Sequence, residues 1–123
     1  MKQKEIIEKL RGFSPVAKED HIEIKVPVVM RLYDAFLMLQ ITPLEEGYMI
    51  SDDGHTFDEW NHDLSYYFHL FLQNDTNYHY DIQSSKEKIY KVYPENFSVA
   101  VALDEFVRFF IALDDFILKH NIT

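Results

Sequence analysis

The chain has 123 residues, a formal net charge of −9 and no cysteine. Its length fits one domain spanning residues 1–123, and the missing cysteines exclude disulfides, thiolate metal ligands and a cysteine nucleophile. No apolar run approaches the roughly 18 residues that a membrane span needs. We therefore predict a soluble, cytoplasmic protein without a membrane partner.

The negative charge is concentrated in the middle of the chain. From Leu32 to Ser85 there is no Lys or Arg, whereas Asp and Glu recur throughout this segment. Such a field repels phosphate backbones, so we expect no direct binding of nucleic acid. Two interpretations stay open: a solvated acidic surface that aids solubility, or a face for a protein partner with a basic surface, such as a nucleic-acid-binding protein.

The first part of the chain predicts a helix followed by three strands. Residues 2–11 place apolar side chains on one side of a helical pattern. Residues 21–26 alternate apolar and polar side chains, which favours a half-buried strand, and Pro27 then predicts a strand end, an edge or a bulge. Apolar runs of strand length follow at 35–41 and 48–51. Sequential strands with short connections predict an antiparallel meander.

A turn and a second helix follow the third strand. Residues 52–54, Asp-Asp-Gly, are typical of a tight turn. Thr56 and Glu59 have the spacing of a capping box, in which each side chain accepts a hydrogen bond from the other residue's backbone N–H. We therefore predict a helix over residues 56–72 that covers the sheet with its aromatic stripe.

The last part of the chain predicts a hairpin and a long helix. The hairpin pairs 78–82 with 88–93, and the helix spans 98–120. The adjacent acids Asp114 and Asp115 splay around this helix, which predicts that both lie on the surface. The apolar stripe of the helix comprises Val99, Leu103, Phe106, Phe110, Leu113 and Ile117. Together these elements predict an α+β fold: an antiparallel sheet of about three to five strands packed against two main helices, with a short N-terminal helix.

The stretch Ile50-Ser-Asp-Asp-Gly-His-Thr56, between a strand and a helix, resembles a bacterial and prophage family known as domain of unknown function number 1828. The likeness covers about residues 6–117, and its specificity rests mainly on this one turn. Around residues 28–35 the chain departs from the polar, Asp/Arg-containing turn that the family tends to have. The resemblance implies this order of elements and a bacterial or phage setting, and it implies no activity.

Asp and His residues around the turn form a candidate metal site. Asp58 and His62 are spaced to share one helix face, and Asp53 and His55 precede them. These carboxylate and imidazole groups would suit a divalent metal, in a small metal-dependent enzyme or a metal-binding regulator. Alternatively, the Asp side chains shape the turn and the histidines face solvent. We favour the second interpretation and expect no cofactor.

Other catalytic patterns are weaker. Glu23 and Lys25 match the Glu-x-Lys strand motif of metal-dependent nucleases, but the nearest earlier acids, Glu19 and Asp20, directly precede the same strand instead of lying on an earlier element. Alternating polar positions on an exposed strand face explain this tripeptide better. The chain contains no Gly-x-Ser-x-Gly nucleophile elbow, and its three glycines are too few for a phosphate-binding loop.

Aromatic residues favour a contact surface. The chain has eight Tyr, ten Phe and one Trp, more than a domain of this size easily buries, and tyrosines suit positions that are half apolar and half wet. We predict that a partner, either a second copy of the chain or a foreign protein, binds at Asp52, Asp53, Asp58, Tyr66 and Tyr78. The predicted function is that of a non-catalytic, acidic protein that binds and modulates another macromolecule; the alternative is the metal-dependent enzyme described above.

Overall fold

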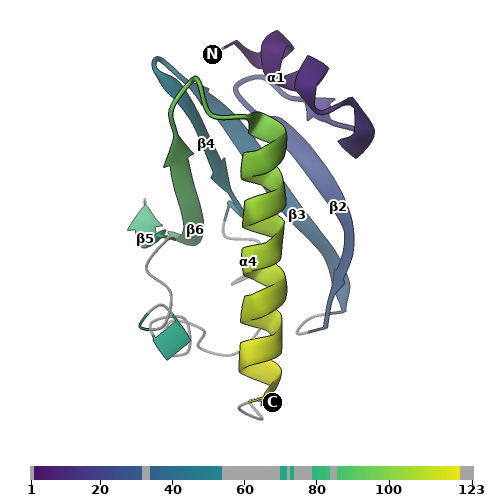
Figure 1. Cartoon of the computed structure of the whole chain (residues 1–123), viewed down its shortest axis with the longest axis vertical. Coiled ribbons are helices and arrows are strands. Elements are labelled where there is room, and N and C mark those ends of the chain that lie inside the picture. The colour runs from purple at the N-terminus through teal and green to yellow at the C-terminus, as the bar shows by residue number, and fades with distance from the viewer. Residues whose placement is uncertain are drawn as a thin grey trace.

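The computed structural model describes residues 2–31, 34–53, 70–71, 73, 79–83 and 86–119. A six-stranded antiparallel sheet carries the long helix α4 across one face, while α1 lies near one end of the sheet (Figure 1). The strands are β1 (Val16–Ala17), β2 (Ile22–Met30), β3 (Ala35–Leu44), β4 (Gly47–Ser51), β5 (His79–Gln83) and β6 (Lys86–Tyr93); the helices are α1 (Gln3–Lys9), the 3-10 helix η1 (Arg11–Phe13) and α4 (Val99–Lys119). The predicted α+β class is confirmed.

The order of strands across the sheet is β1-β2-β3-β4-β6-β5, with antiparallel pairing at every step. The predicted meander forms β2, β3 and β4, and the predicted hairpin forms β5 and β6. The sequence pattern does not predict the two-residue edge strand β1. The helix predicted over residues 56–72 lies outside the described residues, except for residues 70 and 71, which are helical.

Pro27 interrupts the pairing of β2 with β3 without ending the strand. The register shifts between Val26 and Val29, so Pro27 and Val28 have no direct partner in β3. Proline has no N–H to give to the ladder, and a bulge at this position lets the pairing resume beyond it. The strand then continues to Met30, which takes the chain to the far end of α4.

The hydrophobic core lies between α4, α1 and one face of the sheet. The predicted stripe of α4 is confirmed, since all six of its residues are fully buried. Alternate residues of the strands supply the other side, because side chains in a strand point to opposite faces. The buried strand residues are Ile22, Ile24, Val26, Met30, Leu37, Leu39, Ile41, Tyr48, Ile50, Ile89 and Tyr93. Each such side chain contributes roughly 1.5–3 kcal/mol through burial.

An ion pair joins the end of β2 to the C-terminal part of α4. The backbone N–H and the Nε–H of Arg31 donate to Oδ2 of Asp114, at 3.2 and 3.0 Å, and its guanidinium also contacts Asp115. These hydrogen bonds raise the pKa of Arg31, and the bond to Asp114 has the largest effect. The prediction that Asp114 lies on the surface is wrong: its exposed fraction is 4%, because Arg31 arrives from a strand that is distant in sequence.

Helix α4 is long but not membrane-like. It has 21 residues, yet no helix in the described part of the chain is long and apolar enough to cross a membrane. Acidic and basic side chains recur along its outer side, including the Asp104–Arg108 pair one turn apart. The helix is therefore amphipathic, with its apolar side turned to the sheet.

Candidate functional site

The face of the sheet opposite α4 carries a row of polar side chains. Glu23 of β2 is the direct partner of Gln40 of β3, and Gln40 is the direct partner of Ser51 of β4. Tyr90 of β6 continues the row beside Ser51. Directly paired residues of antiparallel strands point to the same side, so these four side chains follow one another across the sheet.

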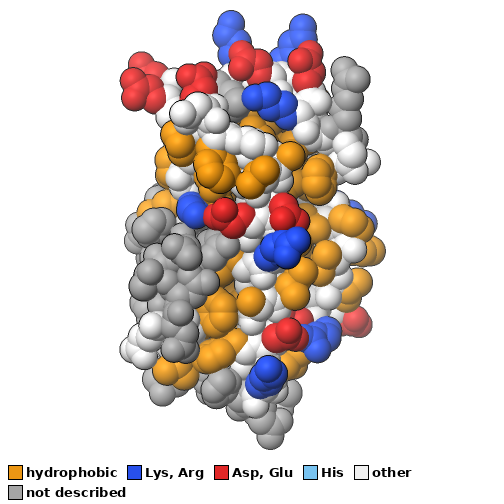
Figure 2. Space-filling view, viewed as in Figure 1, with side chains coloured by type: hydrophobic (Ala, Val, Ile, Leu, Met, Phe, Trp, Pro, Cys, Tyr) orange, Lys and Arg blue, Asp and Glu red, His pale blue; other side chains and the backbone are white. Residues whose placement is uncertain are grey.

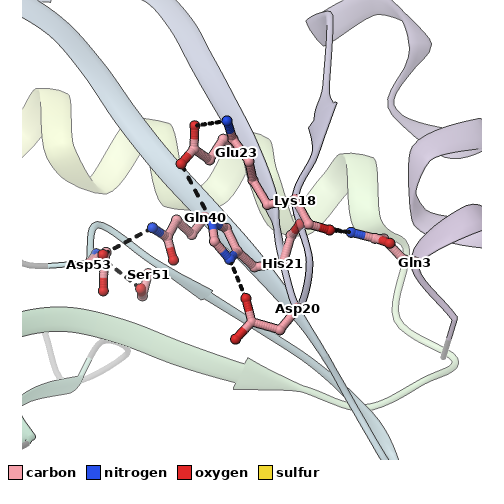
Figure 3. A network of polar contacts seen from close by, with 8 residues as sticks. All are labelled: Gln3, Lys18, Asp20, His21, Glu23, Gln40, Ser51 and Asp53. Carbon is pink, nitrogen blue, oxygen red and sulfur yellow. Dashed lines mark hydrogen bonds and ion pairs between the residues drawn. The ribbon is translucent and has the colours of Figure 1, made fainter.

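Asp53 joins this row from the turn that follows β4. Its backbone is left-handed, with φ 49°, a conformation that Asp and Asn adopt more readily than most residues. Its N–H donates to Oγ of Ser51 at 3.0 Å, and its Oδ2 accepts from Nε2 of Gln40, also at 3.0 Å (Figure 3). The residue predicted to meet a partner is thus held beside β3 by two hydrogen bonds.

A cavity of about 200 Å³ lies along this row, and it is lined by Glu23, Met38, Leu39, Gln40 and Asp52. Met38 contributes an apolar wall, and Glu23, whose side chain is 36% exposed, contributes a carboxylate. A long basic side chain has the same two parts, an apolar stem and a cationic head. The cavity therefore suits a Lys or Arg side chain better than it suits a neutral polar group.

Asp52 is buried and makes different hydrogen bonds from Asp53. Its exposed fraction is 1%, its N–H donates to the carbonyl of Ile89 at 3.1 Å, and its Oδ1 accepts from the N–H of Ile89 at 2.9 Å. The carboxylate thereby replaces the backbone carbonyl that a longer β4 would offer to β6. Of the two adjacent acids in the turn, Asp52 holds the strands together, and Asp53 lies at the polar row.

His21 lies beside Glu23 at the start of β2, with a carboxylate next to each ring nitrogen. Nδ1 is 2.7 Å from Oδ1 of Asp20, and Nε2 is 3.5 Å from Oε1 of Glu23 (Figure 3). The ammonium of Lys18 is 3.9 Å from the other oxygen of Glu23. The side-chain amide of Gln3 donates to the carbonyls of Lys18 and His21, which attaches α1 to this corner.

The hydrogen bond to Asp20, supported by the one to Glu23, raises the pKa of His21, and the same bond to His21 lowers the pKa of Asp20. A raised His pKa stabilises the fold below the ordinary value of about 6.5, and this contribution is lost as the pH rises through the folded-state pKa. Just above pH 6.5, a larger fraction of His21 is therefore charged in the folded chain than in the unfolded chain.

We expect the stability of the wild type to fall relative to that of His21→Gln as the pH rises from 5.5 to 8. Thermal unfolding of both chains at several pH values measures this difference. The contributions of the other five histidines cancel, because both chains contain them. Asp20 titrates far below this window and contributes a constant amount. Parallel stability curves for the two chains would contradict the bridge between Asp20 and Glu23.

The other predicted site residues lie outside the described residues: His55, Asp58, His62, Tyr66 and Tyr78. The metal site that uses Asp53 with three of them therefore stays a prediction. Among the residues that the structure does describe, no group of three or more His, Asp or Glu side chains is arranged to hold a metal ion.

The Glu-x-Lys pair does not form the compact arrangement of the nuclease motif. Glu23 and Lys25 are on the same face of β2, but the ammonium of Lys25 is 4.6 Å from the ring centroid of Phe36. Phe36 pairs with Val29, further along β2 and away from Glu23. The lysine is thus engaged with an aromatic ring in the direction opposite to the polar row.

Sequence reasoning did not single out Gln40 or His21. The Asp-His-x-Glu spacing of residues 20–23 is a readable signal for a bridged histidine, but the neighbourhood of Gln40 depends on strand register. Comparisons with protein families, curated proteins and solved structures find no match to this chain. The resemblance to domain of unknown function number 1828 stays a prediction, and function has to be argued from the geometry.

Proposed function

We propose that the chain is a non-catalytic, acidic interaction protein that acts in the cytoplasm by binding a basic protein partner and modulating it. The observation that carries this proposal is the partly apolar cavity lined by Glu23, Met38 and Gln40, in which Gln40 also donates to the carboxylate of Asp53. The bacterial or phage setting rests on the resemblance of residues 50–56. A nucleic-acid-binding protein has the basic surface that this site requires.

The charges around the cavity favour a cationic ligand. Glu23 faces the pocket, and Asp53 accepts from Gln40. An incoming guanidinium would donate to Glu23 and Asp53 while its stem packs against Met38. Hydrogen bonds between ionised partners are stronger than neutral ones, and a pocket that excludes some water strengthens them further.

The location of the other described acids favours this pocket over a broad acidic face. Asp34 precedes β3, and Glu45 and Glu46 follow it, so these exposed acids lie at opposite ends of a ten-residue strand. Among the described acids of the Lys/Arg-free segment, these three therefore do not form one face. Long-range attraction would come from the net charge, and the specific contact would come from Glu23 and Asp53.

Binding of a peptide of nine arginines, measured by isothermal titration calorimetry, tests the pocket directly. The double variant Glu23→Gln/Asp53→Asn keeps side-chain size and the left-handed turn while it removes two charges. We expect about tenfold weaker binding than that of the wild type, because two charge-assisted hydrogen bonds are lost. Binding by the wild type should also weaken as the salt concentration rises.

The matched control is Glu45→Gln/Glu46→Gln, which removes the same two charges at the exposed tip between β3 and β4. We expect it to bind within about twofold of the wild type, since it lowers only the long-range attraction. Equal losses in the two variants would show that the pocket has no special role. The wild type, the pocket variant and the control can then each serve as bait in cell extract. A natural partner is a protein that binds to the wild type and to the control but not to the pocket variant.

A further inference from the structure

The outer side of α4 has an exposed stripe of alternating apolar and charged residues. Val101 is 54% exposed and Ile111 is 41% exposed. Between them lie Asp104 and Arg108, joined by a 2.8 Å hydrogen bond from Nε of Arg108 to Oδ2 of Asp104. Their spacing of three, four and three residues keeps all four side chains on one side of the helix. Figure 2 views this side, with hydrophobic patches between adjacent red and blue side chains.

From this stripe we infer that two copies of the chain associate through α4, with the two helices antiparallel and related by a two-fold axis. The axis passes midway between Asp104 and Arg108. In that position Asp104 of each copy faces Arg108 of the other, so the intrachain pair becomes a ring of four alternating charges. An isologous contact requires such self-complementarity, because the same patch meets itself.

The charge pattern selects this register over its neighbours. Moving the axis by half a turn toward the N-terminus would place Asp104 opposite Asp104 of the other copy. Moving it equally far toward the C-terminus would place Arg108 opposite Arg108. Both shifts bring like charges together at the centre of the contact, where repulsion costs most.

The same register also matches the uncharged residues. Val101 of one copy faces Ile111 of the other, at both ends of the charged ring and about 15 Å apart along the helix. A shallow hollow of about 440 Å³ runs along this side, lined by Asp104, Val107, Arg108, Ile111, Ala112 and Asp115. It gives room for the side chains of the second helix.

The contact is limited to one helix from each copy, which places it among small interfaces. Interfaces below about 1,200 Å² belong to weak and transient complexes, so a dissociation constant in the range of about 10–100 μM is expected. The dimer does not depend on the partner proposed above. It does not cover the cavity beside Glu23 and Gln40, since these residues are on the opposite face of the sheet.

Sedimentation velocity of the full chain between 5 and 500 μM tests the inference. The wild type should shift from monomer to dimer over this range. Arg108→Asp and Asp104→Arg should each stay monomeric at 500 μM, because each puts four like charges around the axis. Their equimolar mixture should form a heterodimer again, because every Asp then faces an Arg across the contact.

Lys119→Asp is the control, since it makes the same change of charge as Arg108→Asp near the exposed end of α4. It should dimerise within about threefold of the wild type. Arg108 is 77% exposed and Asp104 is 61% exposed, so these substitutions do not touch the core. A wild type that is monomeric at 500 μM, a dimer that survives Arg108→Asp, or a mixture that stays monomeric would each overturn the inference.

Discussion

Replacing Gly47 by alanine is expected to lower the free energy of unfolding by about 3 kcal/mol or more. Gly47 begins β4 after the Glu45–Glu46 connection, and its φ of 125° is a conformation that L side chains rarely adopt. A Cβ at this position would lie 2.2 Å from the carbonyl oxygen of Tyr93, a backbone atom of β6 that cannot rotate away. The variant must therefore distort either the hairpin or the β4–β6 pairing.

Gly12→Ala is the matched control for Gly47→Ala. Gly12 lies in η1, and an added Cβ would meet no atom within 4 Å. We expect its effect to stay within about 0.5 kcal/mol, as for an ordinary surface substitution. Urea unfolding of the three chains, followed by circular dichroism, measures both values. If the two variants were equally stable, the close approach of Gly47 to Tyr93 would be wrong.

The second large effect is expected for Asp52→Ala, which should lose about 2–3 kcal/mol of stability. The substitution removes the carboxylate that accepts from the N–H of Ile89, and it leaves this buried donor without that acceptor at the end of β4. An unsatisfied buried N–H costs more than a hydrogen bond contributes, because its hydration has already been given up. The same urea experiment gives the magnitude.

Two asparagine variants separate the buried acid Asp52 from its partly exposed neighbour Asp53. Asp52→Asn keeps an oxygen that accepts from Ile89, so we expect it to recover most of the stability that Asp52→Ala loses. Asp53→Asn keeps both the acceptor for Gln40 and the tolerance for a left-handed backbone, and it should fold as well as the wild type. A larger loss for Asp53→Asn than for Asp52→Ala would reverse the roles that the structure gives to these residues.

This pair of acids also connects stability to the proposed function. Asp52 fixes the end of β4 against β6, and the next residue, Asp53, is thereby placed beside Gln40. A variant that loosens Asp52 should weaken binding of the arginine peptide as well as folding. Asp53→Asn should weaken binding alone, which makes the two contributions distinguishable.

Much of the fold follows from local pattern. Apolar alternation predicts β2, and apolar runs of strand length predict β3 and β4. The strict spacing of Val99 to Ile117 predicts α4 and its buried side, because that period matches a helix. Composition and charge also predict an acidic protein in which the middle segment has no Lys or Arg. These features depend on neighbours within one or two helical turns or strand repeats.

Contacts between distant segments were decided by the tertiary structure. Asp52 and Asp53 are adjacent acids of the same chemistry. Asp52 is buried and accepts a hydrogen bond from Ile89 of β6, whereas Asp53 accepts one from Gln40 at the polar row. Asp114 is likewise buried because Arg31 reaches it from the end of β2. Which acid links β4 to β6 and which lies at the polar row depends on strand register and packing, since these set the partner of each side chain across the sheet.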